Sequence, residues 1–305
     1  MNNEFQDLNA ATKYYSKKLL ESSSIETTNP SNVERYKKQL GGEVMQEFFK
    51  IKDSTAVIGT YENHKPFRWW MYGEILSEFL NLDPPVQYKY RPELFNQHYD
   101  LLEDGRMQYT YSNRLTEFNQ FVNIYKKLKE NPNSKRAVTA IYTPYDTASD
   151  RADSPCTLMQ SFLHRNGKLN MTFFMRSWDV FGGFKSYDFA FQSFTLQSLC
   201  SWLDMKPGTM GVYTTSLHYY NRDRQNLERL VEESSTSSKR SDKLILDGNL
   251  KIGEFYNQLR QVKLCEEAAY NDNFTKAYEI RDKLTSNLFK EICDVYMKKN
   301  TKSNK

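Results

Sequence analysis

Large apolar side chains recur every three to four residues between positions 68 and 80, which predicts a helix with one strongly apolar face. This mostly apolar stretch carries Glu74. A second amphipathic pattern covers residues 115–130 and ends at the turn sequence Asn131-Pro132-Asn133-Ser134. Residues 189–204 predict another helix, and residues 255–299 have a mostly helical pattern.

Strand patterns lie between these helices. Residues 137–142 are β-branched and apolar, and residues 211–216 form a further short strand pattern. Residues 157–163 and 168–175 alternate around Asn166-Gly167, a dipeptide typical of a tight hairpin. The mixture predicts a single α+β domain built on one mixed β-sheet with flanking helices.

The chain divides by composition into three parts. Residues 1–50 form a polar lead-in with short helical stretches and a turn cluster at positions 29–32. Residues 51–232 are expected to form the core of the fold. Residues 233–305 are expected to begin as a flexible Ser-rich loop, at positions 234–241, and to continue as a mostly helical C-terminal extension.

Composition limits the class of protein. The 305 residues are 39% hydrophobic and 14% aromatic, too apolar for a disordered chain. No run approaches the ~18 apolar residues of a membrane span, so we expect a soluble cytoplasmic protein that does not bind membranes. The Asn-, Lys- and Tyr-rich composition fits an AT-rich, viral genome, which would place the protein in a host cytoplasm. A net charge of +4 favours a small anion such as a nucleotide and does not favour nucleic acid as a partner.

The four cysteines are scattered, without a CxxC pair or metal-ligand spacing, so neither a disulfide framework nor a metal site is expected. Cys156 follows a proline at the end of a polar loop and opens a strand, whereas Cys200 lies on an apolar helix face and is expected in the core. The hairpin could return Arg176 to the Cys156 thiol and favour its thiolate. The residues alone favour the other interpretation, in which Cys156 is a buried, inert cysteine and Arg176 a surface arginine.

Several motifs, which include Cys156 and Arg176, follow one another along the chain. They are Pro155-Cys156 with Gln160, Arg176-Ser177-Trp178-Asp179-Val180-Phe181 with Gly183, Tyr187-Asp188-Phe189-Ala190, and His218-Tyr219-Tyr220. Upstream lie Glu74 and the segment Asn131-Pro132-Asn133-Ser134-Lys135-Arg136-Ala137. The ordered set, over roughly residues 65–225, resembles the thymidylate synthase family, whose members add a one-carbon unit to C5 of a pyrimidine nucleotide.

The resemblance implies a thymidylate synthase-like fold that dimerises through its sheet, with active sites shared in a homodimer. It also implies a pyrimidine nucleoside monophosphate as substrate and 5,10-methylenetetrahydrofolate as co-substrate, with no metal. A pyrimidine C5 becomes nucleophilic only after a thiolate adds to C6, so Cys156 would be the nucleophile. Glu74 would move protons, and Asp188 would contact the base.

The remaining site residues are also implied by the resemblance. Arg176 and Ser177 would hold the phosphate, together with Arg136 and Lys135 from the partner subunit. His218 and Tyr220 would bind the sugar, and Gln160 would belong to the substrate site. Asp179, Gly183 and Tyr111 would face the folate, although packing explains Tyr111 equally well.

Asp188 stands where thymidylate synthases usually have asparagine, if the preceding loop carries one extra residue. An amide complements uracil, whereas a carboxylic acid can donate to N3 of cytosine and accept from its N4 amino group. The same substitution is found in phage-type deoxycytidylate hydroxymethylases. Without the extra residue, Asp188 would be an ordinary helix-capping acid.

The sequence departs from the thymidylate synthase family in two places that bear on the reaction product. Thr157 follows the cysteine where the family usually has histidine, and the C-terminus lacks the apolar closing segment of the methylases. A different closure is compatible with admitting water to react. The leading hypothesis is hydroxymethylation of dCMP. The alternatives are a thymidylate synthase-type methylase, a dUMP hydroxymethylase, a non-catalytic nucleotide- or RNA-binding relative, and a structural partner subunit.

Overall fold

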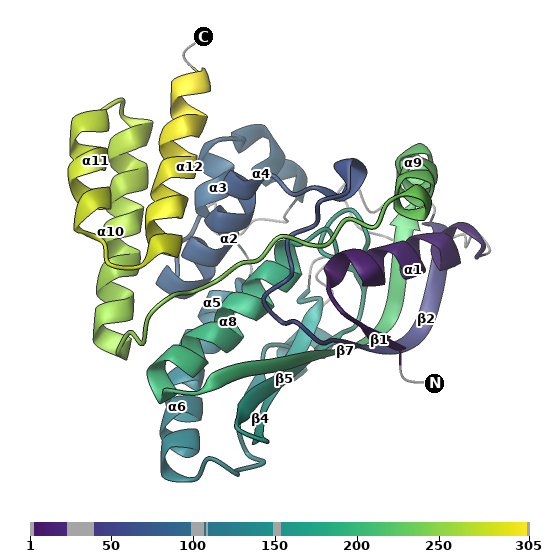
Figure 1. The fold of residues 1–305 in the computed structure, drawn as a ribbon, viewed down its shortest axis with the longest axis horizontal. Helices are drawn as coiled ribbons and strands as arrows, with labels where there is room; N and C mark the ends of the chain where they lie inside the picture. Colours follow the sequence, from purple (N-terminus) through teal and green to yellow (C-terminus); the bar gives the residue numbers. More distant parts are fainter. Residues whose placement is uncertain (1–2, 23–39, 99–106, 108, 149–153, 304–305) are drawn as a thin grey trace.

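The fold is built on one mixed sheet with helices packed against it (Figure 1). The computed structural model describes residues 3–22, 40–98, 107, 109–148 and 154–303. The seven strands run in the order β1-β2-β7-β5-β4-β3, with β6 paired to β7. They are β1 (Asn3–Phe5), β2 (Leu40–Ile51), β3 (Val138–Ala140), β4 (Thr157–Arg165), β5 (Lys168–Met175), β6 (Trp178–Asp179) and β7 (Lys206–Tyr220). The predicted α+β class is confirmed.

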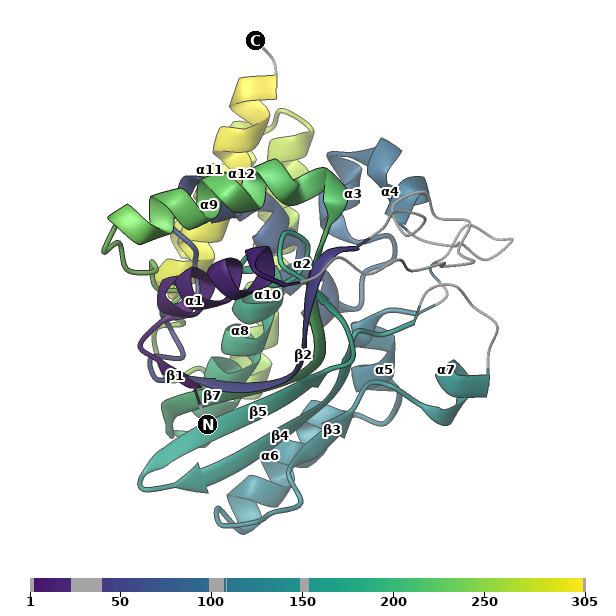
Figure 2. The ribbon, with the colours of Figure 1, turned by 90° about the vertical axis from the view of Figure 1, so that its right-hand side faces the viewer.

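The helices fall into groups around this sheet. They are α1 (Leu8–Leu20), α2 (Arg68–Leu80), α3 (Val86–Lys89), α4 (Pro92–His98), α5 (Tyr111–Glu117), α6 (Gln120–Glu130), α7 (Pro144–Ala148), α8 (Tyr187–Leu203), α9 (Arg224–Thr236), α10 (Ile252–Tyr270), α11 (Phe274–Lys283) and α12 (Asn287–Ser303). Helix α8 lies against one face of the sheet, and α10, α11 and α12 lie together beyond it (Figures 1 and 2). Within the described ranges, no helix is long and apolar enough to cross a membrane.

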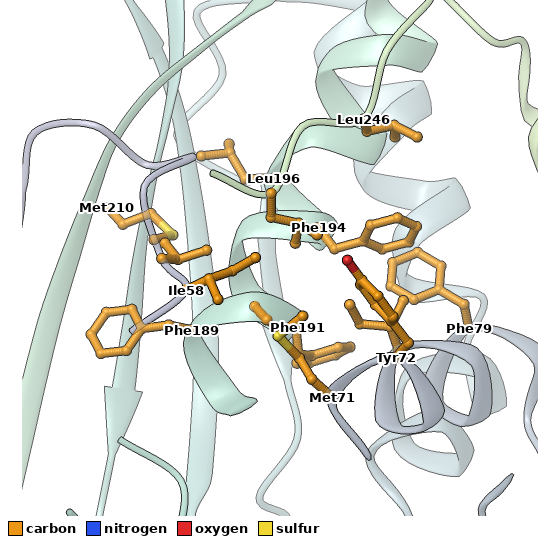
Figure 3. Close-up of a cluster of buried hydrophobic side chains, with 14 of the residues drawn as sticks. Ile58, Met71, Tyr72, Phe79, Phe189, Phe191, Phe194, Leu196, Met210 and Leu246 are labelled. Atoms are coloured by element: carbon orange, nitrogen blue, oxygen red, sulfur yellow. The ribbon is translucent and has the colours of Figure 1, made fainter. Parts of the chain in front are cut away.

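Helix α8 is buried on all sides between the sheet and the other helices. Every residue from Phe189 to Trp202 is buried. Its polar side chains are tied to neighbouring segments, as where the Ser193 hydroxyl donates to the Ser54 carbonyl at 2.7 Å. Figure 3 shows Phe79 of α2 beside Phe194 of α8, and their rings meet edge to face with centroids 4.9 Å apart. This packing fixes α2 relative to the sheet.

Helix α2 has the bounds that its apolar spacing predicted. It buries Met71, Tyr72, Ile75, Leu76 and Phe79. Its end is set by Asn81 in the left-handed region at φ 54°, a conformation that asparagine tolerates better than most residues. The local hydrophobic period was therefore sufficient to place this helix.

The C-terminal helices support α2 from the side away from the sheet. On α12, Glu291 accepts hydrogen bonds from the Tyr72 hydroxyl at 2.6 Å and from Nη1 of Arg68 at 2.8 Å. The Tyr296 hydroxyl of the same helix donates to the Trp69 carbonyl at 2.9 Å. The extension is thus part of the scaffold that holds α2.

Three local expectations differ from the structure. Residues 3–5 and 40–51 are strands, so the polar lead-in supplies part of the sheet; its turn cluster at positions 29–32 lies outside the described residues. The helix expected over residues 115–130 is two helices, because Asn119 adopts a left-handed φ of 48° between α5 and α6. The Ser-rich segment is not a free loop: it is helical to Thr236, and the buried Ser241 Oγ accepts from the Asn9 amide at 2.8 Å.

Candidate active site

The β4–β5 hairpin brings Cys156 and Arg176 together. Its turn is the predicted dipeptide, with φ 54° at Asn166 and 72° at Gly167, values typical of a two-residue type I′ turn. At the open end of the hairpin, Thr157 pairs with Met175, and the Arg176 amide donates to the Cys156 carbonyl at 2.9 Å. A thiol and a guanidinium-bearing residue therefore lie at one edge of the sheet.

The Arg176 side chain holds the loop that leads to the cysteine. Its Nε donates to the Pro155 carbonyl at 2.9 Å, and its Nη2 donates to the Ser154 carbonyl at 2.7 Å. These two contacts fix the backbone just before Cys156. That cysteine is partly exposed, whereas the other three, Cys200, Cys265 and Cys293, are buried.

Strands β6 and β7 add His218 at the same edge of the sheet. The parallel β6–β7 register pairs Asp179 with His218, whose side chain is buried. Burial, and then the charge of Arg176, lower the pKa of His218 to about 4, so the imidazole is neutral at physiological pH. A neutral imidazole has one donor and one acceptor nitrogen, which suits a sugar hydroxyl.

A short polar chain orients this histidine. Nδ1 of His218 lies 3.2 Å from the Ser216 hydroxyl, and that hydroxyl donates to the Glu43 carboxylate. On the other side, the Tyr220 ring meets the His218 ring at 83° with centroids 5.3 Å apart. The Arg222 guanidinium lies 5.1 Å from the centroid of the Tyr220 ring.

Asp188 sits in the first turn of α8 and is held by an indole. Nε1 of Trp178 donates to its Oδ2 at 2.7 Å. A Cβ at Gly183 would lie 1.9 Å from the same oxygen, so this contact requires glycine there. Burial raises the pKa of Asp188 to about 6, although the indole hydrogen bond opposes the shift. The acid can exchange its proton near neutral pH.

Glu74 projects from α2 and is also held by an indole. Nε1 of Trp70, four residues earlier on the helix, donates to Glu74 Oε1 at 2.8 Å. Burial, and next the charge of Asp188, raise the pKa of Glu74 to about 8. Glu74 is therefore mainly protonated at neutral pH, and a charge on Asp188 favours that protonated form.

Tyr111 begins α5 next to the cysteine. Its hydroxyl accepts a hydrogen bond from the Thr157 amide at 3.1 Å. Burial raises the pKa of Tyr111 well above its usual value, and the charges of Cys156 and Asp188 raise it further. The phenol thus stays protonated beside the sheet edge that carries Cys156.

Gln160 and Asp179 make contacts within the protein. Gln160 is buried, with its Nε2 donating to Gln192 at 2.7 Å and its Oε1 accepting from Thr139 at 3.0 Å. Asp179 Oδ1 accepts from the Phe181 amide at 3.0 Å, which closes the turn after β6. These contacts shape the strands and the loop around the site.

Lys135 and Arg136 lie away from Cys156 in the same chain. They are exposed and precede β3, where the Ala137 carbonyl accepts from the Phe162 amide. Phe162 is six residues from Cys156 along β4, a separation of about 20 Å in an extended strand. Contact with a phosphate at the sheet edge would therefore require a second subunit.

Sequence reasoning overlooked several residues of this site. Trp70 and Glu78 flank Glu74 at four-residue spacing on one helix face, a signal that the sequence does carry. Trp178 stood in one of the quoted motifs, but nothing there indicated its contact with Asp188. Glu43 and Ser216 had no signal, because their contact joins segments that are distant in the sequence. Among the described residues, no group of three or more His, Cys, Asp or Glu side chains is arranged to hold a metal ion.

Comparisons with known proteins identify a family for this chain. The profile of the thymidylate synthase family matches residues 41–277. A deoxyuridylate hydroxymethyltransferase of Bacillus phage SP01 is 36% identical over 106 residues, which cover 34% of this chain and 28% of that protein. A putative thymidylate synthase of Methanosarcina barkeri is 28% identical over 179 residues, 52% of this chain and 81% of that protein. The chain belongs to the thymidylate synthase family.

Proposed function

We propose that the protein transfers a one-carbon unit from a folate to C5 of a pyrimidine nucleoside monophosphate, and that it converts dCMP to 5-hydroxymethyl-dCMP. The observation that carries the choice of base is the partly buried Asp188, held by Trp178 with a pKa near neutrality. Family membership supports the reaction class, and 5,10-methylenetetrahydrofolate would supply the one-carbon unit.

Cys156 is the proposed nucleophile toward C6 of the base. The Arg176 guanidinium holds the Ser154-Pro155 carbonyls and so fixes the cysteine loop. Its positive charge also favours a thiolate and attracts the nucleotide phosphate. Ser177 follows it on the chain and would donate a further hydrogen bond to that phosphate.

Asp188 is the proposed reader of the base. Cytosine presents an acceptor at N3 and a donor at N4, so a carboxyl group complements it when one proton is shared between the acid and N3. Because the pKa of Asp188 is about 6, sharing the proton costs little free energy near neutral pH. The Trp178 indole occupies Oδ2 and thereby fixes the orientation of the carboxyl group.

Glu74 is the proposed proton shuttle. Its pKa of about 8 keeps a proton available at neutral pH, and its Trp70 contact limits its rotation. In hydroxymethylation, water attacks the methylene carbon that has been joined to C5, and Glu74 accepts and returns protons during that step. In methylation the folate would instead deliver a hydride and leave as dihydrofolate.

A homodimer is the proposed assembly. The sheet face opposite α8 carries apolar side chains, with Leu163 37% exposed and Val138 40% exposed, and the Phe174 and Tyr213 rings lie 5.9 Å apart on neighbouring strands. Packing this face against a second copy would bury it and could bring Lys135 and Arg136 to the phosphate of the other subunit. Lysine would supply a point charge there, and arginine a bidentate fork.

Hydroxymethylation of dUMP is the second candidate. The phage relative is named for deoxyuridylate and hydroxymethyl transfer, and its match covers a third of this chain. A neutral Asp188 could also pair with uracil, by donating to O4 and accepting from N3–H. Only cytosine offers a ring nitrogen that can take the proton itself, which favours dCMP.

The test is incubation of the protein with 5,10-methylenetetrahydrofolate and either dCMP or dUMP, followed by product mass and folate absorbance. We expect a hydroxymethyl product from dCMP with tetrahydrofolate left unoxidised. A methyl product with dihydrofolate absorbance would contradict hydroxymethylation. Activity on dUMP alone would contradict the assignment of the base and favour the second candidate.

A further inference from the structure

Glu78 is a second acid on the helix that carries Glu74. Trp70, Glu74 and Glu78 are spaced four residues apart on α2, so they lie on one face of the helix. Glu78 is partly buried as a residue, and its Oε2 atom is fully buried. An acid in such a place is costly unless its polar atoms have a use.

The two carboxylate oxygens of Glu78 have different surroundings. The backbone N–H of Ser112, in the first turn of α5, hydrogen-bonds to the carboxylate. Oε2 is buried and has no hydrogen-bond partner in the part of the chain that the structure describes. One oxygen thus joins α2 to α5, and the other is left for a group that enters the site.

The charges of neighbouring acids contribute to the raised pKa values of Glu74 and Glu78. Burial, and then the charge of Asp188, raise the pKa of Glu78 to about 8, and the charge of Glu78 in turn contributes to the raised pKa of Glu74. The ionisable groups nearby are Asp188 and Tyr187 of α8, with Tyr296 of α12 close to Glu74. The tyrosine pKa values are raised by burial, so both phenols stay protonated at neutral pH.

We propose that Glu78 is a positioning residue which, as a neutral acid, holds a water molecule between its Oε2 and the Glu74 carboxyl. The inference rests on the proposed function and deepens it, because this water is placed for proton transfer and for hydroxymethylation. Side chains four residues apart on a helix have Cβ atoms roughly 5–6 Å apart, and no hydrogen bond directly joins the two described carboxyls. Their spacing suits a bridging water, which needs two to four polar partners.

A merely structural alternative is that Glu78 only caps α5. The hydrogen bond from Ser112 would then be its whole purpose, and Glu78 would affect stability alone. Thr110 provides the matched control, because its hydroxyl caps the same helix by accepting from the Asn113 amide at 2.9 Å. Thr110→Ala removes a cap of α5 and leaves the carboxyl groups in place.

The experiment measures tritium release from C5-labelled nucleotide, per folded molecule and across pH, for wild type, Glu78→Gln, Glu78→Leu and Thr110→Ala. Gln can accept from Ser112 and donate to water, so E78Q should stay within about threefold of wild type at neutral pH. E78L should lose roughly 10- to 100-fold, the size expected when a reacting group is misplaced. T110A should change the melting temperature but leave the release rate unchanged.

The pH dependence of tritium release separates the two roles, because it would not change if Glu78 only capped α5. In wild type the alkaline limb should reflect two overlapping ionisations, because Glu74 and Glu78 interact; in E78Q it should follow one. Wild-type release and an unchanged profile in E78L would overturn the positioning role. If the wild-type protein itself releases no tritium from either nucleotide, the proposed function fails first, and the role of Glu78 in it falls as well.

Discussion

The indole of Trp178 and the carboxyl of Asp188 form a 2.7 Å hydrogen bond that joins a strand to a helix ten residues further along the chain. Trp178 lies on β6, which pairs with β7 beside His218, and Asp188 opens α8. The bond therefore links the proposed reader of the base to the strand that carries the proposed sugar ligand.

Asp188→Asn should shift the preference of the site from cytosine to uracil. An amide cannot share a proton with cytosine N3, but it complements uracil. Binding of dCMP should weaken roughly tenfold to hundredfold, because an unpaired buried polar group costs about 1–3 kcal/mol. Binding of dUMP should improve. Titration calorimetry with both nucleotides measures this change, and an unaltered preference would remove Asp188 from base recognition.

Gly183→Ala should displace the Asp188 carboxyl. The added Cβ would lie 1.9 Å from Asp188 Oδ2 and 2.7 Å from Trp178 Nε1, so the hydrogen bond cannot persist. Nucleotide affinity should fall while the fold survives, because a side-chain terminus can move. Gly253→Ala on α10 is the control, since no atom lies within 4 Å of its Cβ position. Equal affinities for G183A and wild type would show that the Asp188 orientation is irrelevant.

Elements whose signals lie within a short stretch of sequence were predicted correctly, and elements that depend on distant segments were not. The hairpin at Asn166-Gly167 and the bounds of α2 depend on short-range turn chemistry and helical period, and both were predicted correctly. Strands β1 and β2 were missed because their burial comes from pairing with distant segments. Phe49 of β2, for example, pairs with Val212 on one side and Asn3 on the other.

The same distinction applies to the site. The proximity of Cys156 and Arg176 could be predicted, because a hairpin brings its two ends together. The roles of Glu43 and Trp178 could not, since each acts through a partner whose position only the folded sheet defines. Glu78 lies between these cases: its spacing from Glu74 is visible in the sequence, but its contact with α5 is not.

His64 should make stability depend on pH. It is fully buried, and neither ring nitrogen has a partner in the described chain. Burial, and next Lys185, lower its pKa to about 3, whereas the unfolded value is about 6.5. Between these two pH values His64 is therefore protonated in the unfolded state but not in the folded state. The free energy of unfolding is unaffected by His64 above pH 6.5 and decreases as the pH falls below that value.

His64→Leu should flatten that dependence. The slope of unfolding free energy against pH below 6.5 should decrease by up to about 1.4 kcal/mol per pH unit. Urea denaturation at pH 6.5 and pH 5 measures the difference. The same slope in the variant and in wild type would mean that His64 is protonated in the folded state or that other groups dominate acid unfolding.

Glu291→Ala should loosen α2. The substitution leaves the buried Tyr72 hydroxyl without its acceptor, and we expect a loss of roughly 1–3 kcal/mol in unfolding free energy. Because α2 carries Glu74, the rate of C5 exchange should fall as well. The control is Glu279→Ala on α11, whose exposed pair with Lys276 spans 3.9 Å and should contribute less than about 1 kcal/mol. Equal stability of the two variants would contradict a supporting role for α12.

The proposed function depends most directly on covalent catalysis by Cys156 toward a cytosine nucleotide. Tritium release from C5-labelled dCMP in the presence of 5,10-methylenetetrahydrofolate tests it, with Cys156→Ala as the variant and Cys200→Ala, in the buried helix α8, as the control. We predict release by wild type and by C200A, faster with dCMP than with dUMP, and none by C156A. Release that persists in C156A, or its absence from wild type with both nucleotides, would contradict the account.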